Sequence, residues 1–145
     1  MKVERSIDIA APANDVYELI MDPRRLEDWV TIHHHLELAP EGRLKMGAKV
    51  TQCLKLAGRK FKVRWTVVEN DPCKRVVWEG EGPIFSHARV VYEFAPDGEN
   101  VTHFSYTNEY DLPGGALGKL AGRTVKRVTG KEVDGSLQKL KSLLE

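Results

Sequence analysis

Residues 60–67 read KFKVRWTV and show the clearest alternation of polar and apolar side chains in the chain. The apolar side chains of Phe61, Val63, Trp65 and Val67 occupy every second position, with Lys, Lys, Arg and Thr between them. Because successive side chains of a β-strand point to opposite faces, this period of two predicts a strand with one buried and one solvated face.

The same alternation recurs on both sides of this stretch, and turn residues such as Gly58 and Asn70-Asp71-Pro72 separate the repeats. Short connections of this kind join antiparallel neighbours. The strands are expected near residues 3–9, 30–39, 48–56, 60–67, 76–78, 88–94 and 102–110.

Helical patterns flank the strands. Pro12 ends the first strand and opens a short helix, and Asp22-Pro23 starts a second one near residues 24–29. After Pro113 the apolar period becomes helical and stays so to the end of the chain. The apolar stripe changes phase around Gly130, which predicts a bend there or two helix faces that pack on different partners.

This order of elements predicts an α+β fold of the helix-grip type. A curved seven-stranded antiparallel sheet buries one face and wraps around a long C-terminal helix, with two short helices between strands 1 and 2. We expect residues 1–145 to form a single ligand-binding domain of ordinary size.

Composition restricts the partners of the domain. The 22 basic and 21 acidic residues give a formal net charge of +1, which offers no electrostatic basis for binding nucleic acid or an anionic membrane. No apolar run approaches the ~20 residues that span a bilayer, and no apolar signal region opens the chain. We therefore expect a cytoplasmic protein without integral membrane association, with Cys53 and Cys73 as free thiols.

Several motifs carry a resemblance to a known family. They are the opening Ile7-Asp8-Ile9-Ala10-Ala11-Pro12 followed by Val16-Tyr17, the segment Asp22-Pro23…Leu26…Trp29, and the Leu-Pro-Gly-Gly entry to the terminal helix. With the order of elements, they resemble the START / birch-pollen-allergen (SRPBCC) superfamily, and within it the bacterial polyketide cyclase/dehydrase-type and lipid-transport-type members. The resemblance implies an internal cavity but no shared catalytic signature.

The inward side of the predicted sheet is mostly aromatic with a few polar groups, the lining that a small-molecule pocket needs. Gly118 and Gly122 lie one helical turn apart and either leave room for a ligand or allow close packing on the sheet. The glycine-bearing loops at Gly58, Gly80–Pro83 and Leu112–Gly115 are expected to frame the opening. The candidate ligand-binding residues are Gln52, Phe61, Trp65, Trp78, Tyr92, Phe104, Tyr106, Asn108, Tyr110, Gly118 and Gly122.

The first functional hypothesis is non-covalent binding of a small hydrophobic molecule such as a lipid, polyketide or aromatic metabolite, without a cofactor. The alternative is a cyclase/dehydrase-type enzyme, with His34 as the base and Tyr106 polarising a carbonyl. The alternation places His34 inward beside Ile32 and Leu36, and His33 and His35 outward. Consecutive strand residues do not converge on one ion, so no metal site is expected.

A third hypothesis is a protein-interaction module. The middle of the last helix is locally basic, which is typical of the solvated face of an amphipathic helix but also suits a partner surface. Its basic residues are Arg123, Lys126, Arg127 and Lys131. Exposed sheet edges and the second helix stripe also make a homodimer possible.

Overall fold

The computed structural model describes the backbone of residues 1–111 and 116–145, and the side chains of these residues except 116–122. Its seven strands form one antiparallel sheet in the order β1-β7-β6-β5-β4-β3-β2, so the first strand lies beside the last. The strands are β1 (Lys2–Ile9), β2 (His33–Leu38), β3 (Lys49–Leu56), β4 (Arg59–Asp71), β5 (Arg75–Glu81), β6 (His87–Pro96) and β7 (Thr102–Tyr110). The predicted helix-grip fold is confirmed.

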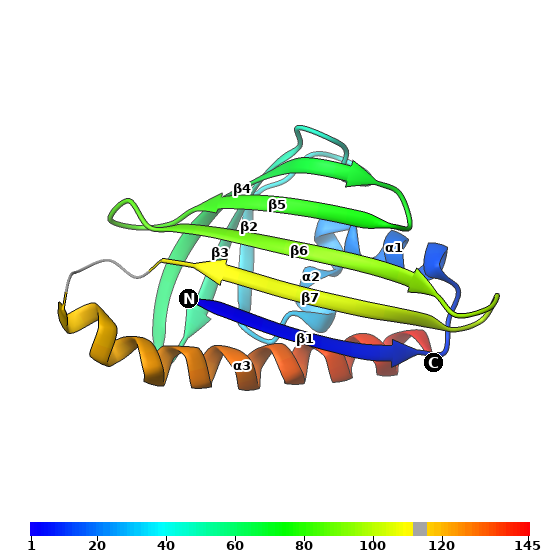
Figure 1. Cartoon of the computed structure of the whole chain (residues 1–145). Helices are drawn as coiled ribbons and strands as arrows, with labels where there is room; N and C mark the ends of the chain where they lie inside the picture. The colour runs from blue at the N-terminus through cyan, green and yellow to red at the C-terminus, as the bar shows by residue number, and fades with distance from the viewer. Residues whose placement is uncertain (112–115) are drawn as a thin grey trace.

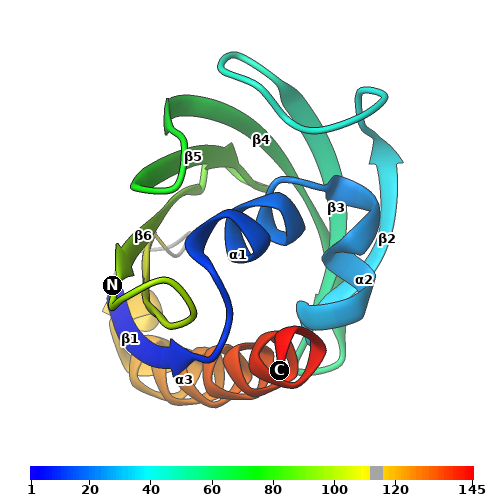
Figure 2. The same ribbon diagram turned by 90° about the vertical axis from the view of Figure 1, so that its right-hand side faces the viewer.

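The long helix α3 (Ala116–Leu144) runs beneath the sheet along β1, and the sheet curls from there around to β2 (Figures 1 and 2). Val133, Leu137 and Leu140 anchor its C-terminal half in the core. The helix continues without interruption through Gly130, where its backbone faces the guanidinium of Arg5 on β1. Five residues later Gly135 faces Thr31, so two faces of the helix meet different partners.

Two short helical segments cover one end of the curled sheet (Figure 2). Helix α1 (Ala13–Ile20) buries four apolar side chains, and η1 (Pro23–Arg25) leads directly into α2 (Leu26–Trp29). Pro12 holds extended backbone before α1, and the Asp22 carboxylate accepts a hydrogen bond from the Arg24 amide at 3.1 Å. Pro12 and Asp22 therefore precede the two helix starts that the sequence predicts.

The register of the sheet shifts at three places. The β2–β3 register shifts between His33 and His35 and again between Leu36 and Leu38, and the β4–β5 register shifts between Val67 and Glu69. A bulge of this kind adds one residue to a strand and reverses the facing of the residues beyond it. The first of these bulges decides where the three consecutive histidines point.

Candidate functional site

The inner face of the sheet carries a continuous set of aromatic rings. The Trp65 and Trp78 rings meet edge to face at 6.1 Å, and Trp78 meets Tyr92 in the same way at 5.9 Å. Tyr92 stacks on Phe104 at 5.7 Å and meets Tyr106 at 5.2 Å. The predicted inward aromatic residues therefore share one face, and they pack on one another as well as lining the interior.

Gln52 forms the centre of a polar relay on this face. The Trp65 indole N–H donates to the Gln52 amide oxygen at 3.0 Å. Because an indole can only donate, the Gln52 amide nitrogen faces the other way and donates to Nδ1 of His33 at 2.8 Å. His33 therefore carries its proton on Nε2, and burial lowers the pKa of this imidazole below its ordinary value.

A second group of inner polar atoms has no such partner. Within the described part of the chain, four buried side-chain atoms lack a hydrogen bond: Trp29 Nε1 in α2, and Trp78 Nε1, Asn108 Oδ1 and Tyr110 Oη on the sheet. The register brings the three sheet atoms together, because Trp78, Val90 and Asn108 form one row across β5, β6 and β7. Tyr110 stands in the next row, opposite the small residue Ala88. Buried polar atoms without partners are costly, so such a cluster calls for an explanation.

The two inner tyrosines Tyr92 and Tyr106 are hydrogen-bonding groups rather than bases. Burial, reinforced by the neighbouring Tyr106, raises the pKa of Tyr92 well above its ordinary value. Burial likewise raises the pKa of Tyr106 to about 12. Both phenols therefore stay protonated across the physiological range and offer O–H donors to the interior.

The predicted inward position of His34 is wrong. His34 is exposed, and His33 takes the inward position opposite Leu54. The bulge in β2 is the physical cause, since it inserts one residue between His33 and Leu36, both of which face inward. Sequence reasoning missed His33 because nothing in its residue type or spacing signals the bulge.

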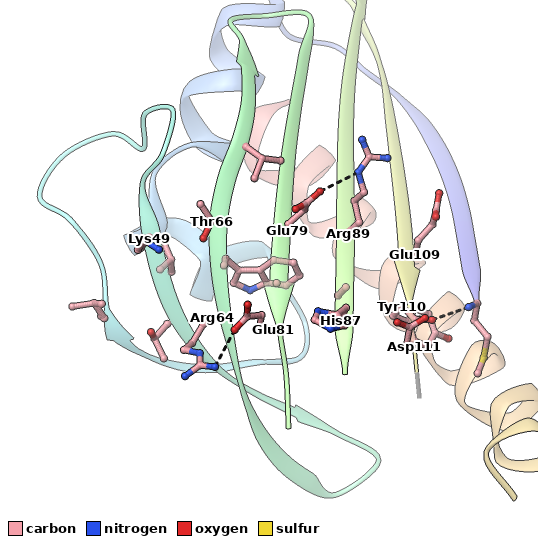
Figure 3. A pocket seen from close by; sticks show the side chains of 18 of the residues that line it. Lys49, Arg64, Thr66, Glu79, Glu81, His87, Arg89, Glu109, Tyr110 and Asp111 are labelled. Atoms are coloured by element: carbon pink, nitrogen blue, oxygen red, sulfur yellow. Dashed lines mark hydrogen bonds and ion pairs between the residues drawn. The ribbon is translucent and has the colours of Figure 1, made fainter. Parts of the chain in front are cut away.

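A depression of about 1160 Å³ lies on the outer face of the sheet, away from α3 (Figure 3). Its lining combines exposed charged side chains with apolar groups, and ion pairs join Arg64 to Glu81 at 3.0 Å and Arg89 to Glu79 at 3.9 Å. All four side chains are strongly exposed. The hollow is a solvated surface that carries exposed ion pairs, and Trp65 and Tyr110 of the inner rows also contribute to its lining.

Part of the predicted opening lies outside the described residues. This holds for the Leu112–Gly115 segment and for the surroundings of Gly118 and Gly122 within α3. The antiparallel order places the β3–β4 turn at Gly58 and the β5–β6 loop at the same end of the sheet as the exit from β7. At the tip of the β5–β6 loop, Ile84 and Phe85 are 76% and 95% exposed.

The basic residues of α3 are solvent-facing. Arg123, Lys126, Arg127 and Lys131 are all exposed, as expected for the outer side of this helix. In the described parts of the chain, no helix is long and apolar enough to cross a membrane.

The whole chain, residues 1–145, matches the family described as polyketide cyclase / dehydrase and lipid transport. The protein belongs to this family, which confirms the resemblance of the sequence to polyketide cyclase/dehydrase-type and lipid-transport-type members. Among curated proteins it is similar to Toxin Rv0910 of Mycobacterium tuberculosis, with 25% identity over 95 residues. That match covers 66% of this chain and 66% of the relative's length.

Solved structures share the fold across nearly the whole chain. TTHA0849 from Thermus thermophilus is 23% identical with a TM-score of 0.82, covering 98% of this chain and 95% of that one. The Zhui aromatase/cyclase from Streptomyces sp. R1128 is 18% identical with a TM-score of 0.79, covering 99% and 93%. At these identities the likeness concerns the fold, while the family supports a ligand-binding or cyclase role.

Proposed function

We propose that this protein binds a small, mostly apolar molecule on the inner face of its sheet, held by a few hydrogen bonds. The observation that carries the proposal is the cluster of Trp78 Nε1, Asn108 Oδ1 and Tyr110 Oη, buried without partners among the described residues. Two of these groups can donate and one can accept, so a ligand with a carbonyl or hydroxyl satisfies them. The surrounding aromatic rings supply the apolar wall.

The charge pattern favours binding over catalysis. Around this cluster the inner positions are aromatic, aliphatic or neutral polar, and the tyrosines stay protonated. Arg5, which pairs with Tyr106 in the register, is engaged by Asp134 of α3 at 2.9 Å. A group with an ordinary proton-transfer role needs a pKa near the working pH. The inner face is thus better suited to holding a ligand than to moving its protons.

Two fluorescent probes with opposite hydrogen-bonding character test the site. N-phenyl-1-naphthylamine offers one N–H donor, which pairs with Asn108 Oδ1, and prodan offers a ketone acceptor, which pairs with Tyr110. Asn108→Leu should lower the affinity for the amine probe, and Tyr110→Phe should lower the affinity for prodan. Each loss should be about fivefold, because one hydrogen bond contributes roughly 1 kcal/mol.

Tyr17→Phe is the matched control, because the Tyr17 hydroxyl already donates to Asn70 at 2.8 Å beside α1. It should leave both affinities unchanged. Equal affinities in wild type, Asn108→Leu and Tyr110→Phe would remove this cluster from the binding site. Native mass spectrometry of the freshly purified protein adds the mass of any co-purifying molecule, and the same spectrum shows whether the protein is a monomer or a homodimer.

A second candidate, a cyclase/dehydrase-type enzyme, is favoured by one observation: His33 is a neutral imidazole on the inner face. Its Nδ1 lone pair is occupied by Gln52, which weakens it as a base. Turnover of a poly-β-ketone thioester by the wild type, lost in His33→Gln while probe affinity is kept, would establish the enzyme. The same comparison with His34→Ala would test the residue that the sequence favours.

A further inference from the structure

The bulge in β2 gathers three metal-ligating side chains on the outer side of the sheet. One ligand atom each from His34, His35 and Cys53 lies within 4.8 Å of the other two. The two histidine Nδ1 atoms are 2.6 Å apart. Regular alternation would place His34 and His35 on opposite faces, but the register shift between His33 and His35 turns both outward. The alternation argument against a metal site therefore does not apply here.

Glu37 orients His35 for ligation. The Glu37 carboxylate lies 3.3 Å from Nε2 of His35 and can only accept, so the His35 proton sits on Nε2. Nδ1 of His35 then presents its lone pair toward His34 and Cys53. Glu37 is in turn held by Lys62 at 3.1 Å, and the hydrogen bond from Lys62 lowers the pKa of this carboxyl. A carboxylate behind a ligating histidine is the usual outer support of a metal site.

His34 is also prepared for a cation. Nδ1 of His34 currently donates to His35, and moving that proton to Nε2 frees the second lone pair. Lys55 and Lys60 oppose a cation, while a Cys53 thiolate and the Glu37 carboxylate favour one. The ligand atoms therefore decide the affinity.

We propose that His34 Nδ1, His35 Nδ1 and Cys53 Sγ bind a zinc ion, with water in the fourth position. Imidazole and thiolate are the ligands that zinc prefers. Cys53 releases its thiol proton to solvent as it binds. Tetrahedral Zn–N bonds of about 2.0–2.1 Å separate two nitrogens by about 3.3 Å, so the two exposed imidazoles move apart slightly from 2.6 Å. This proposal is independent of the ligand site on the inner face.

Such an ion would clamp β2 to β3, because Cys53 pairs with His35 in the register. The residue before the bulge, His33, holds the Gln52 relay on the opposite face. Zinc is therefore expected to stabilise the fold and to fix the strand that carries this relay.

Cobalt titration of the reduced protein tests the site. A tetrahedral site with a thiolate gives a near-ultraviolet charge-transfer band and strong visible bands, and zinc should bleach both. Cys53→Ser should remove the charge-transfer band. Cys73→Ser is the matched control, because Cys73 is the other free cysteine and lies outside the cluster, and this variant should keep the band.

The histidines and their support give a second readout. His34→Ala and His35→Ala should each weaken cobalt binding at least about tenfold, and Glu37→Ala should weaken it about tenfold. His87→Ala should leave it unchanged. Zinc should raise the thermal midpoint of wild type and Cys73→Ser but not of Cys53→Ser, with circular dichroism confirming that each variant folds. A cobalt spectrum without a charge-transfer band, or a band that persists in Cys53→Ser, overturns the proposal.

Discussion

Gly80 on β5 should not tolerate even one added methyl group. A Cβ built there would lie 2.7 Å from Cε3 of Trp65 and 2.7 Å from Cγ1 of Val63. Ordinary carbon–carbon contacts need about 3.5–4.0 Å, so the overlap is roughly 1 Å on two sides. The Trp65 ring cannot easily retreat, because its indole donates to Gln52 and its edge packs on Trp78.

Overpacking of this kind lowers the free energy of unfolding by about 1–3 kcal/mol. Because both neighbours of the added methyl group are fixed, we expect a loss of about 2 kcal/mol for Gly80→Ala. In a chain of 145 residues this lowers the thermal midpoint by roughly 6–8 °C. Urea unfolding followed by tryptophan fluorescence, and thermal unfolding followed by circular dichroism, measure the change.

The control is Glu79→Ala, because Glu79 is the exposed neighbour of Gly80. This substitution should lower the free energy of unfolding by about 0.5 kcal/mol or less. A Gly80→Ala midpoint within a degree of the wild type would refute the packing of Trp65 over this strand. It would also weaken the description of the inner face, which depends on that packing.

Three further changes test other parts of the structure. Ala57 has a φ of 51° beside Gly58 in the two-residue β3–β4 turn, a backbone conformation that Asn adopts more readily than Ala. Ala57→Asn should therefore raise the free energy of unfolding by about 0.5–1 kcal/mol in urea titrations. Gln52→Leu leaves the Trp65 indole and His33 Nδ1 unpaired, so it should lower the free energy of unfolding by about 2 kcal/mol. In a double-mutant cycle, the combined loss of Gln52→Leu and Trp65→Phe should be smaller than the sum of the two single losses. The folded pKa of His33 is depressed, so its contribution to stability is present above the unfolded value of about 6.5 and is lost as pH falls toward the folded value. The stability gap between wild type and His33→Gln should therefore narrow from pH 7 to pH 5, and a constant gap would contradict the lowered pKa.

The period of two was sufficient to predict the sheet and most of its inner face. Trp65, Trp78, Tyr92, Phe104 and Asn108 all face inward as the alternation requires, because a strand with one buried face allows no other arrangement. The same pattern predicts the seven strands, and the change to a helical period after Pro113 predicts the C-terminal helix. These features depend on local periodicity, which the sequence displays directly.

The failures occur where tertiary structure overrides local periodicity. The β2 bulge exchanged His33 for His34 on the inner face, and no residue type marks its position. Hydrogen bonding was equally invisible, since Gln52 is satisfied by Trp65 and His33, whereas Asn108 has no partner in the described part of the chain. Only the placement of neighbouring strands separates a satisfied core amide from one available to a ligand.

Two-dimensional ¹H–¹⁵N NMR during titration with prodan tests the inner-face site most directly. The chain has three indole N–H groups, and Trp→Phe variants assign their signals. The account predicts that the indole signal of Trp78, unpaired on the inner face, shifts more strongly than that of Trp65, whose N–H already donates to Gln52. Shifts confined to the backbone amides of Arg64, Glu79 and Arg89, with the Trp78 indole unmoved, would place the ligand in the outer depression and contradict the account.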